Sequence, residues 1–190
     1  MKKGDFVVLS CVSNIEWYIA QYACFLFGYI VVPVHPSVSS NYWSSLVSKI
    51  FERLICFVIS SHITGTLEEA IDRSLLKRSN IVLIEDLEES YSNSKKINLC
   101  GRSVSTFWEM ENQNTSDTIL KEIPRSSNDI VMLLPTSGSS GKPKLTIVND
   151  HMLMSQSNPP KKANLMVLFS FEPMRQSLDV LSKGGMIGIY

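Results

Sequence analysis

The sequence predicts an α/β protein built on a largely parallel sheet with helices on both faces. Short apolar runs rich in β-branched residues alternate with segments of helical periodicity, and capping residues or glycines stand at the junctions. Strands and helices that alternate at this spacing are typical of βαβ units, whose crossovers cover both faces of the sheet. A chain of 190 residues with 44% hydrophobic residues is long enough to bury such a core.

Residues 1–87 form the first predicted βαβ region. Asn14 is a good N-cap for the first helix, and Gly28 supplies the conformation at which a helix ends. In chain order, we expect a strand at 5–12, a helix at 15–27, a strand at 29–34, a helix at 41–51, a strand at 54–60, a helix at 65–78 and a strand at 80–86.

The character changes after this region. Residues 88–128 are mostly polar and are interpreted as a long connection outside the core. Residues 129–190 resume the strand pattern and hold a Gly/Ser-rich loop. Here we expect strands at 130–134 and 145–148, a helix from Asp150, a strand at 165–171, a helix at 175–182 and a strand at 186–190.

Composition excludes several classes of function. Eighteen basic residues balance eighteen acidic ones, so no overall field attracts nucleic acid, and a bound anion must be held locally. The cysteines have no disulfide or zinc spacing and are predicted to be reduced, most of them buried. Residues 17–34 could also be read as a short membrane span, but Gln21 and Gly28 interrupt them, which favours a buried helix followed by a strand.

The loop between the strands at 130–134 and 145–148 is the strongest functional candidate. Its glycines allow backbone N–H groups to point into one concavity, its hydroxyls add donors, and Pro143 presents Lys144 on a stiff segment. Such a loop suits phosphate oxygens. The candidate residues are Thr136, Ser137, Gly138, Ser139, Ser140, Gly141, Lys142, Pro143 and Lys144.

The loop has two other interpretations, a Walker A loop and a plain hairpin. A Walker A loop has four residues between its glycines and a Lys-Ser/Thr pair, whereas here two residues separate Gly138 from Gly141 and Pro143 follows Lys142. A P-loop NTPase is therefore disfavoured. A plain hairpin with solvated lysines stays open, because the strand at 145–148 is expected to return beside the one at 130–134.

The stretch "LLPTSGSSGKPKLTIV" resembles the phosphate-binding signature of the adenylate-forming (AMP-binding) superfamily, which includes acyl-CoA synthetases, luciferases, peptide-synthetase adenylation domains and carboxylic acid reductases. Residues 136–144 match its T-S-G-S/T-T/S-G-x-P-K pattern throughout. The segment "KKGDFVVLSCVSNIEWYIAQYACFLFGYIVVPVHPSVSS" is similar to the family's early part, and "LMVLFSFEPMRQSLDVLSKGGMIGIY" to a later part. The chain thus resembles a partial N-terminal domain of such an enzyme, running over residues 1–190.

The resemblance implies ATP and Mg²⁺ as cofactors. It also implies a carboxylic acid substrate, for which a fatty acid is the expected class, that is converted to an acyl-adenylate. Two positions depart from the family: Leu145 stands where glycine is usual, and Gln176 stands in place of a histidine near the acid, which makes it a substrate-pocket candidate. Segments that hold adenine and ribose, and the C-terminal domain with its catalytic lysine, have no counterpart.

We therefore expect the chain alone to be inactive. A complementing C-terminal chain is then a candidate partner. The alternative is a non-enzymatic truncated homologue that at most binds nucleotide or a partner chain. The cytoplasm is the expected compartment, with the protein either free or at a membrane surface, and no transmembrane span is expected.

Overall fold

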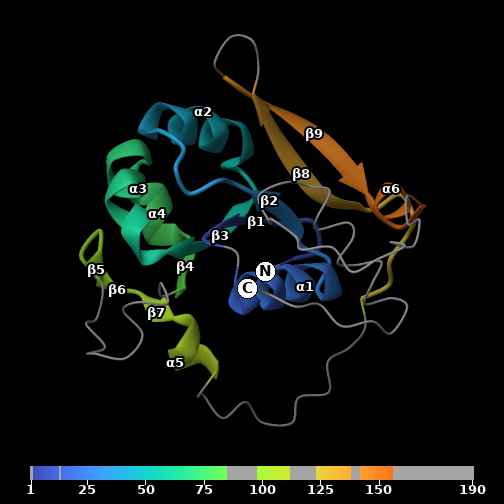
Figure 1. Ribbon diagram of the computed structural model, residues 1–190, viewed down its shortest axis with the longest axis horizontal. Helices are drawn as coiled ribbons and strands as arrows, with labels where there is room; N and C mark the ends of the chain where they lie inside the picture. The colour runs from blue at the N-terminus through green and yellow to red at the C-terminus, as the bar shows by residue number, and fades with distance from the viewer. Residues whose placement is uncertain (1, 13, 85–97, 112–122, 138–141, 156–190) are drawn as a thin grey trace, which may run out of the picture.

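A computed structural model describes residues 2–12, 14–84, 98–111, 123–137 and 142–155. The predicted elements at 165–171, 175–182 and 186–190 lie outside the described residues, as does Gln176. The expected α/β fold with a largely parallel sheet is confirmed in the part that the structure describes (Figure 1).

The centre of the fold is a seven-stranded sheet with the order β7-β4-β3-β1-β2-β8-β9. Every neighbouring pair is parallel except β8 and β9, which form an antiparallel hairpin. The strands are β1 (Phe6–Ser10), β2 (Ile30–Pro33), β3 (Leu54–Ser60), β4 (Asn80–Ile84), β7 (Ser105–Thr106), β8 (Ile130–Ser137) and β9 (Pro143–Asn149). Two further strands, β5 (Asn98–Leu99) and β6 (Arg102–Ser103), pair with each other.

Helices cover both faces of this sheet, as the βαβ pattern requires. Helix α1 (Ile15–Leu26) lies on one face, opposite α2 (Ser40–Ile50), the short η1 (Ser61–Ile63), α3 (Thr64–Ala70) and α4 (Arg73–Arg78) (Figure 1). Alternate residues along β1 divide between two hydrophobic clusters. Val7 and Leu9 belong to the cluster under α1, called the α1-side cluster, and Val8 belongs to the α2-side cluster.

Helix α1 shows how the sequence sets its own limits. The Asn14 side chain accepts a hydrogen bond of 3.0 Å from the Trp17 amide, as predicted for an N-cap. The helix ends before Gly28, which has φ +68°. Its outer side is apolar as well, since Ile15, Ile19 and Leu26 are exposed. A helix that is apolar on every side is typical of a helix buried between two layers.

The helix predicted at 65–78 is two helices in the structure. Ile71 takes an extended conformation, and its amide closes α3 on the Leu67 carbonyl. Asp72 then begins α4, because its carboxylate accepts a hydrogen bond of 2.7 Å from the Ser74 amide. Aspartate favours the N-cap position over a helix interior, because its side chain accepts a hydrogen bond from the backbone. Asp72 therefore starts a new helix and does not continue α3.

The interpretation of residues 88–128 as a connection outside the core is wrong for its middle part. Leu99 and Val104 are buried in the α2-side cluster, and β7 adds an edge strand beside β4. Helix α5 (Phe107–Glu111) follows, and its start carries a reciprocal capping box. The Glu109 amide donates to Thr106 Oγ1 at 3.2 Å, and the Thr106 amide donates to Glu109 Oε2 at 3.0 Å.

The structure tests the predictions for the cysteines and for a membrane-spanning helix. Cys11, Cys24 and Cys56 are buried and outside any disulfide, as predicted, and Cys100 is half-buried and likewise forms no disulfide. Burial raises the pKa of Cys24 and of Cys56 to about 12, which leaves both as unreactive thiols. Across the described ranges, no helix has the length and apolar character that crossing a membrane requires.

The end of α1 provides a stability test. In Gly28→Ala the alanine would have to keep a positive φ, and its methyl group would lie 3.0 Å from Lys3 Cγ. We therefore expect the free energy of unfolding to fall by about 1–2 kcal/mol. Gly65→Ala is the matched control, because it lies in α3 with no atom within 4 Å of its new methyl group. Urea unfolding should show this control to be neutral or slightly more stable. An equal loss of unfolding free energy in the two variants would contradict the view that α1 ends at a glycine with a positive φ.

Candidate functional site

The candidate loop joins β8 to β9. β8 lies beside β2, with Val31 paired to Met132, and it then reverses into β9. The return of the second strand beside the first is therefore confirmed. The structure describes Thr136 and Ser137 on one strand and Lys142, Pro143 and Lys144 on the other side, whereas Gly138, Ser139, Ser140 and Gly141 lie outside the described residues.

The hairpin extends beyond the sheet at the carboxyl ends of the parallel strands. Counting on from the pair of Val31 with Met132, β8 continues three residues past Pro33, the last residue of β2. At about 3.3 Å per residue, this is a projection of about 10 Å. Figure 1 shows the two strands rising away from the rest of the sheet. Thr136, Lys142 and Lys144 are exposed at this projecting end, where a ligand can reach them, whereas Pro143 is buried.

Cross-strand register brings two candidate residues together. Thr136 pairs directly with Lys144, and Thr136 Oγ1 donates a hydrogen bond of 3.4 Å to the Lys144 carbonyl. Directly paired residues of antiparallel strands point to the same face of a sheet. Because Val148 lies in the α1-side cluster and Lys144 is four residues before it, that face is the one on which α1 lies. A hydroxyl and an ammonium group thus share one face.

No carboxylate among the described residues neutralises the two lysines at the end of the hairpin. Lys142 and Lys144 are exposed, and within the described residues neither of them forms an ion pair with a carboxylate. The same residues contain no group of three His, Cys, Asp or Glu side chains that could hold a metal ion. The available chemistry is therefore that of hydroxyl donors and cations, which suits anionic oxygens.

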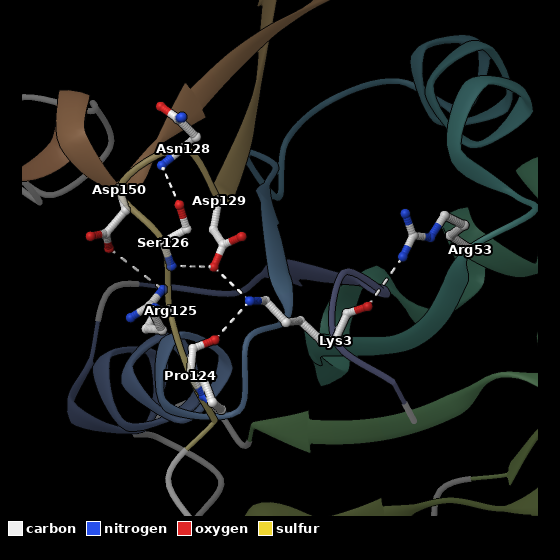
Figure 2. A network of polar contacts seen from close by, with 8 residues as sticks. All are labelled: Lys3, Arg53, Pro124, Arg125, Ser126, Asn128, Asp129 and Asp150. Atoms are coloured by element: carbon white, nitrogen blue, oxygen red, sulfur yellow. Dashed lines mark hydrogen bonds and ion pairs between the residues drawn. The ribbon is translucent and has the colours of Figure 1, made fainter.

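The base of the hairpin is held by a polar network that sequence reasoning missed (Figure 2). Lys3 Nζ lies 2.6 Å from Asp129 Oδ2 and donates to the Pro124 carbonyl at 2.8 Å. The Ser126 amide donates to the same carboxylate at 2.8 Å. Arg53, which begins the approach to β3, donates to the Lys3 carbonyl at 3.2 Å. The first residues of the chain therefore fix the segment that enters β8.

The exit from β9 is tied to the same place. The Asp150 amide donates to the Asp129 carbonyl, and the His151 amide donates to the Ser127 carbonyl, each at 2.9 Å. Asp150 begins α6 (Asp150–Ser155), as the sequence predicted, and lies 3.8 Å from Arg125. Both strands of the hairpin are thus anchored at the end that is opposite to the candidate loop.

A second place in the fold is where α/β sheets often bind ligands. The strand order reverses between β1 and β3, and ligands commonly bind outside the carboxyl ends of such strands. Here Ser10 and Ser60 are both buried, and Ser60 Oγ accepts a hydrogen bond of 3.1 Å from the Val12 amide. This point lies at the same edge of the sheet as the hairpin.

Comparison with known proteins identifies the family. Residues 1–166 match the family model described as AMP-binding enzyme, so the chain belongs to that family. Human long-chain-fatty-acid–CoA ligase 1 is 23% identical over 161 residues, which is 84% of this chain and 22% of the ligase. Long chain acyl-CoA synthetase 8 of Arabidopsis thaliana is 25% identical over 151 residues, 80% of this chain and 20% of the synthetase. The chain spans about a fifth of these relatives.

Solved structures show the same fold. The luciferase-like enzyme of the Zophobas morio mealworm matches with a TM-score of 0.74 at 14% identity, covering 97% of this chain and 41% of that one. The adenylation domain of a carboxylate reductase from Mycobacterium chelonae matches with a TM-score of 0.71 at 13% identity, covering 97% of this chain and 31% of that one. The fold is therefore that of the N-terminal part of adenylate-forming enzymes.

The polar network at the base of the hairpin lowers the pKa of the Asp129 carboxyl group. The hydrogen bond from Lys3, followed by that from the Ser126 amide, lowers the pKa of Asp129 below its usual 3.8. A lowered pKa means that the stabilisation is present above the pKa of the unfolded chain and is lost as pH falls through the folded one. In an NMR titration of the Asp129 carboxyl, Lys3→Met should raise the pKa, whereas Lys49→Met, on exposed α2 surface, should not. An unchanged Asp129 pKa in Lys3→Met would show that Lys3 is not what lowers it.

Proposed function

We propose that the β8–β9 hairpin binds the phosphates of ATP in an enzyme that activates a carboxylic acid as its acyl-adenylate. The observation that carries this proposal is the pairing of Thr136 with Lys144, which sets a hydroxyl and an ammonium group on one face of a projecting hairpin, with no ion pair to the ammonium group among the described residues. The match of residues 136–144 to the family's signature supports it. The long-chain relatives favour a fatty acid as the substrate class.

The proposed chemistry explains the residue types. A carboxylate oxygen attacks the α-phosphorus of ATP, the new acyl–phosphate bond forms, and the bond to pyrophosphate breaks with its electron pair leaving on the β-phosphate oxygen. Negative charge therefore accumulates on the departing β,γ-phosphates. The Lys144 ammonium group and the Thr136 hydroxyl would hold these oxygens in place, and positioning of this kind supplies much of the rate enhancement in phosphate chemistry.

Mg²⁺ fits this site as a companion of the nucleotide. The described hairpin residues offer no carboxylate cluster to bind the ion alone. The Thr136 hydroxyl and the lysines are instead suited to the phosphate oxygens that share the ion. When it is bound with ATP, Mg²⁺ supplies further neutralisation of the leaving pyrophosphate.

We also propose that this chain carries the phosphate-holding part of the reaction and that further polypeptide supplies the rest. The chain spans about a fifth of the long-chain relatives, and the outer side of α1 exposes Ile15, Ile19 and Leu26. These side chains offer an apolar surface for another layer of protein. A homologue that binds nucleotide or a partner chain without catalysis is the second candidate, and the same surface would serve it. The buried cysteines, which form no disulfide in the structure, suit the reducing conditions of the cytoplasm.

Lys144 provides the test of binding. A hydrogen bond to a charged group contributes about 1.5–3 kcal/mol, so Lys144→Ala should raise the Kd of MgATP by about 10- to 100-fold in isothermal titration calorimetry. Thr136→Ala should weaken binding in the same direction. Lys49→Ala is the matched control, because it removes an equal charge from the exposed last turn of α2. If Lys144→Ala and Lys49→Ala bind MgATP as tightly as the parent chain does, the phosphate site is not at this hairpin.

Catalysis is tested separately from binding. Exchange of labelled pyrophosphate into ATP requires the adenylate to form, so we expect no acid-dependent exchange by residues 1–190 alone with short-chain, long-chain or aromatic carboxylic acids. Clear exchange that depends on one of these acids, and that Lys144→Ala abolishes, would contradict the view that further polypeptide is needed. Binding of MgATP without exchange is the predicted combination.

A further inference from the structure

Leu145 stands at the exit of the candidate loop, next to Lys144, and it is partly buried. It packs against the α2-side cluster, which contains Trp43 and Leu46 of α2 and Leu133 of β8. Helix α2 and β9 are in contact in the structure. Leu145 therefore ties the projecting hairpin to the helix layer on the face away from Lys144.

The position of this anchor determines where the lysine points. Successive residues of a strand point to opposite faces, and a slip of one residue moves every side chain to the other face. Leu145 pairs with Pro135, and Lys144 pairs with Thr136. As long as Leu145 stays against the α2-side cluster, Lys144 must lie on the α1 side of the sheet beside Thr136.

Apart from Pro143, which is buried on the same face, the described residues of the hairpin end add little to fix this register. The last described cross-strand contact of a side chain is the long hydrogen bond of 3.4 Å from Thr136 Oγ1 to the Lys144 carbonyl. Beyond Leu145 on the same face, Ile147 is 54% exposed and packs little. The polar network at Lys3 and Asp129 holds only the opposite end of the hairpin. Pro143, two residues nearer to the loop on the same face, is buried as well. Leu145 is the residue of β9 that packs against the α2-side cluster.

We propose that Leu145 is a positioning residue for the phosphate site: its packing under α2 sets the register that places Lys144 and Thr136 on one face. This inference rests on the proposed function for its consequence, which is phosphate binding. Its structural part, that Leu145 holds the register of the hairpin, stands without any ligand. It is also the position at which the sequence departs from the glycine that is usual after the motif lysine.

The experiment compares two glycine substitutions on one strand. Leu145→Gly removes the anchor, whereas Ile147→Gly removes an exposed side chain from the same face two residues away, and both place glycine in β9. Leu145→Met keeps an apolar side chain of similar volume and is the rescue variant. Hydrogen exchange of the full chain without ligand is measured at the amides of Lys142 and of residues 144–149, and the Kd of MgATP is measured on the same samples.

We expect Leu145→Gly to speed exchange at the hairpin by about tenfold more than Ile147→Gly does, because a half-buried leucine contributes a correspondingly large part of the local opening free energy. MgATP binding should weaken by a similar factor and should be restored in Leu145→Met. The amides of β1 and β3 should keep their protection in all three variants, which shows that the fold is intact.

Two results would overturn the inference in different ways. Equal exchange in Leu145→Gly and Ile147→Gly would show that Leu145 does not hold the register. Faster exchange in Leu145→Gly with an unchanged Kd would show that the register does not position the phosphate site. If the parent chain itself binds no MgATP, the proposed function fails, and the exchange comparison still decides whether Leu145 is the anchor.

Discussion

The structure depends on the pairing of β8 with two partners of opposite direction. Met132 of β8 is paired with Val31 in the parallel sheet and with Val148 in the hairpin, and all three are buried in the α1-side cluster. This junction fixes the hairpin to the core at one end and sends its other end beyond the sheet. The network of Lys3 and Asp129 secures the same base. A loop that binds phosphate needs this combination, because its donors must be exposed while the strands that carry them stay in place.

Sequence patterns predicted the parallel sheet and most of its elements, because β1, β2, β3 and β4 are mostly buried apolar runs and α1 has a recognisable cap in Asn14. They failed where tertiary packing decides. β7 contains only Ser105 and Thr106, which is too short for any periodicity, and Leu99 and Val104 are isolated apolar residues in a polar segment. The capping box of Thr106 and Glu109 was the available signal for α5. Asp72 is also a residue type that favours an N-cap, but the helical periodicity on both sides of it led to the prediction of one continuous helix.

For the candidate site, the sequence predicted which residues belong to it but not how they are arranged. The spacing of the motif names Thr136 and Lys144, whereas the register that pairs them appears only in the folded hairpin. The substitution at Leu145 was visible as a departure from the family, and its physical meaning needed the packing against the α2-side cluster. The contact of Lys3 with Asp129 joins residues far apart in the chain, and no local pattern marks such a pair.

The central claim is that the hairpin, rather than the point where the strand order reverses, receives the phosphates of ATP. Paramagnetic broadening of amide signals by MnATP tests it most directly, because the ion stays on the phosphates and broadens only signals close to it. The account predicts strong broadening at Thr136 and Lys144, with little at Asp129 and Lys3 at the opposite end of the hairpin. Broadening centred on Ser10 and Ser60, at the carboxyl ends of β1 and β3, with the hairpin signals unchanged, would contradict it.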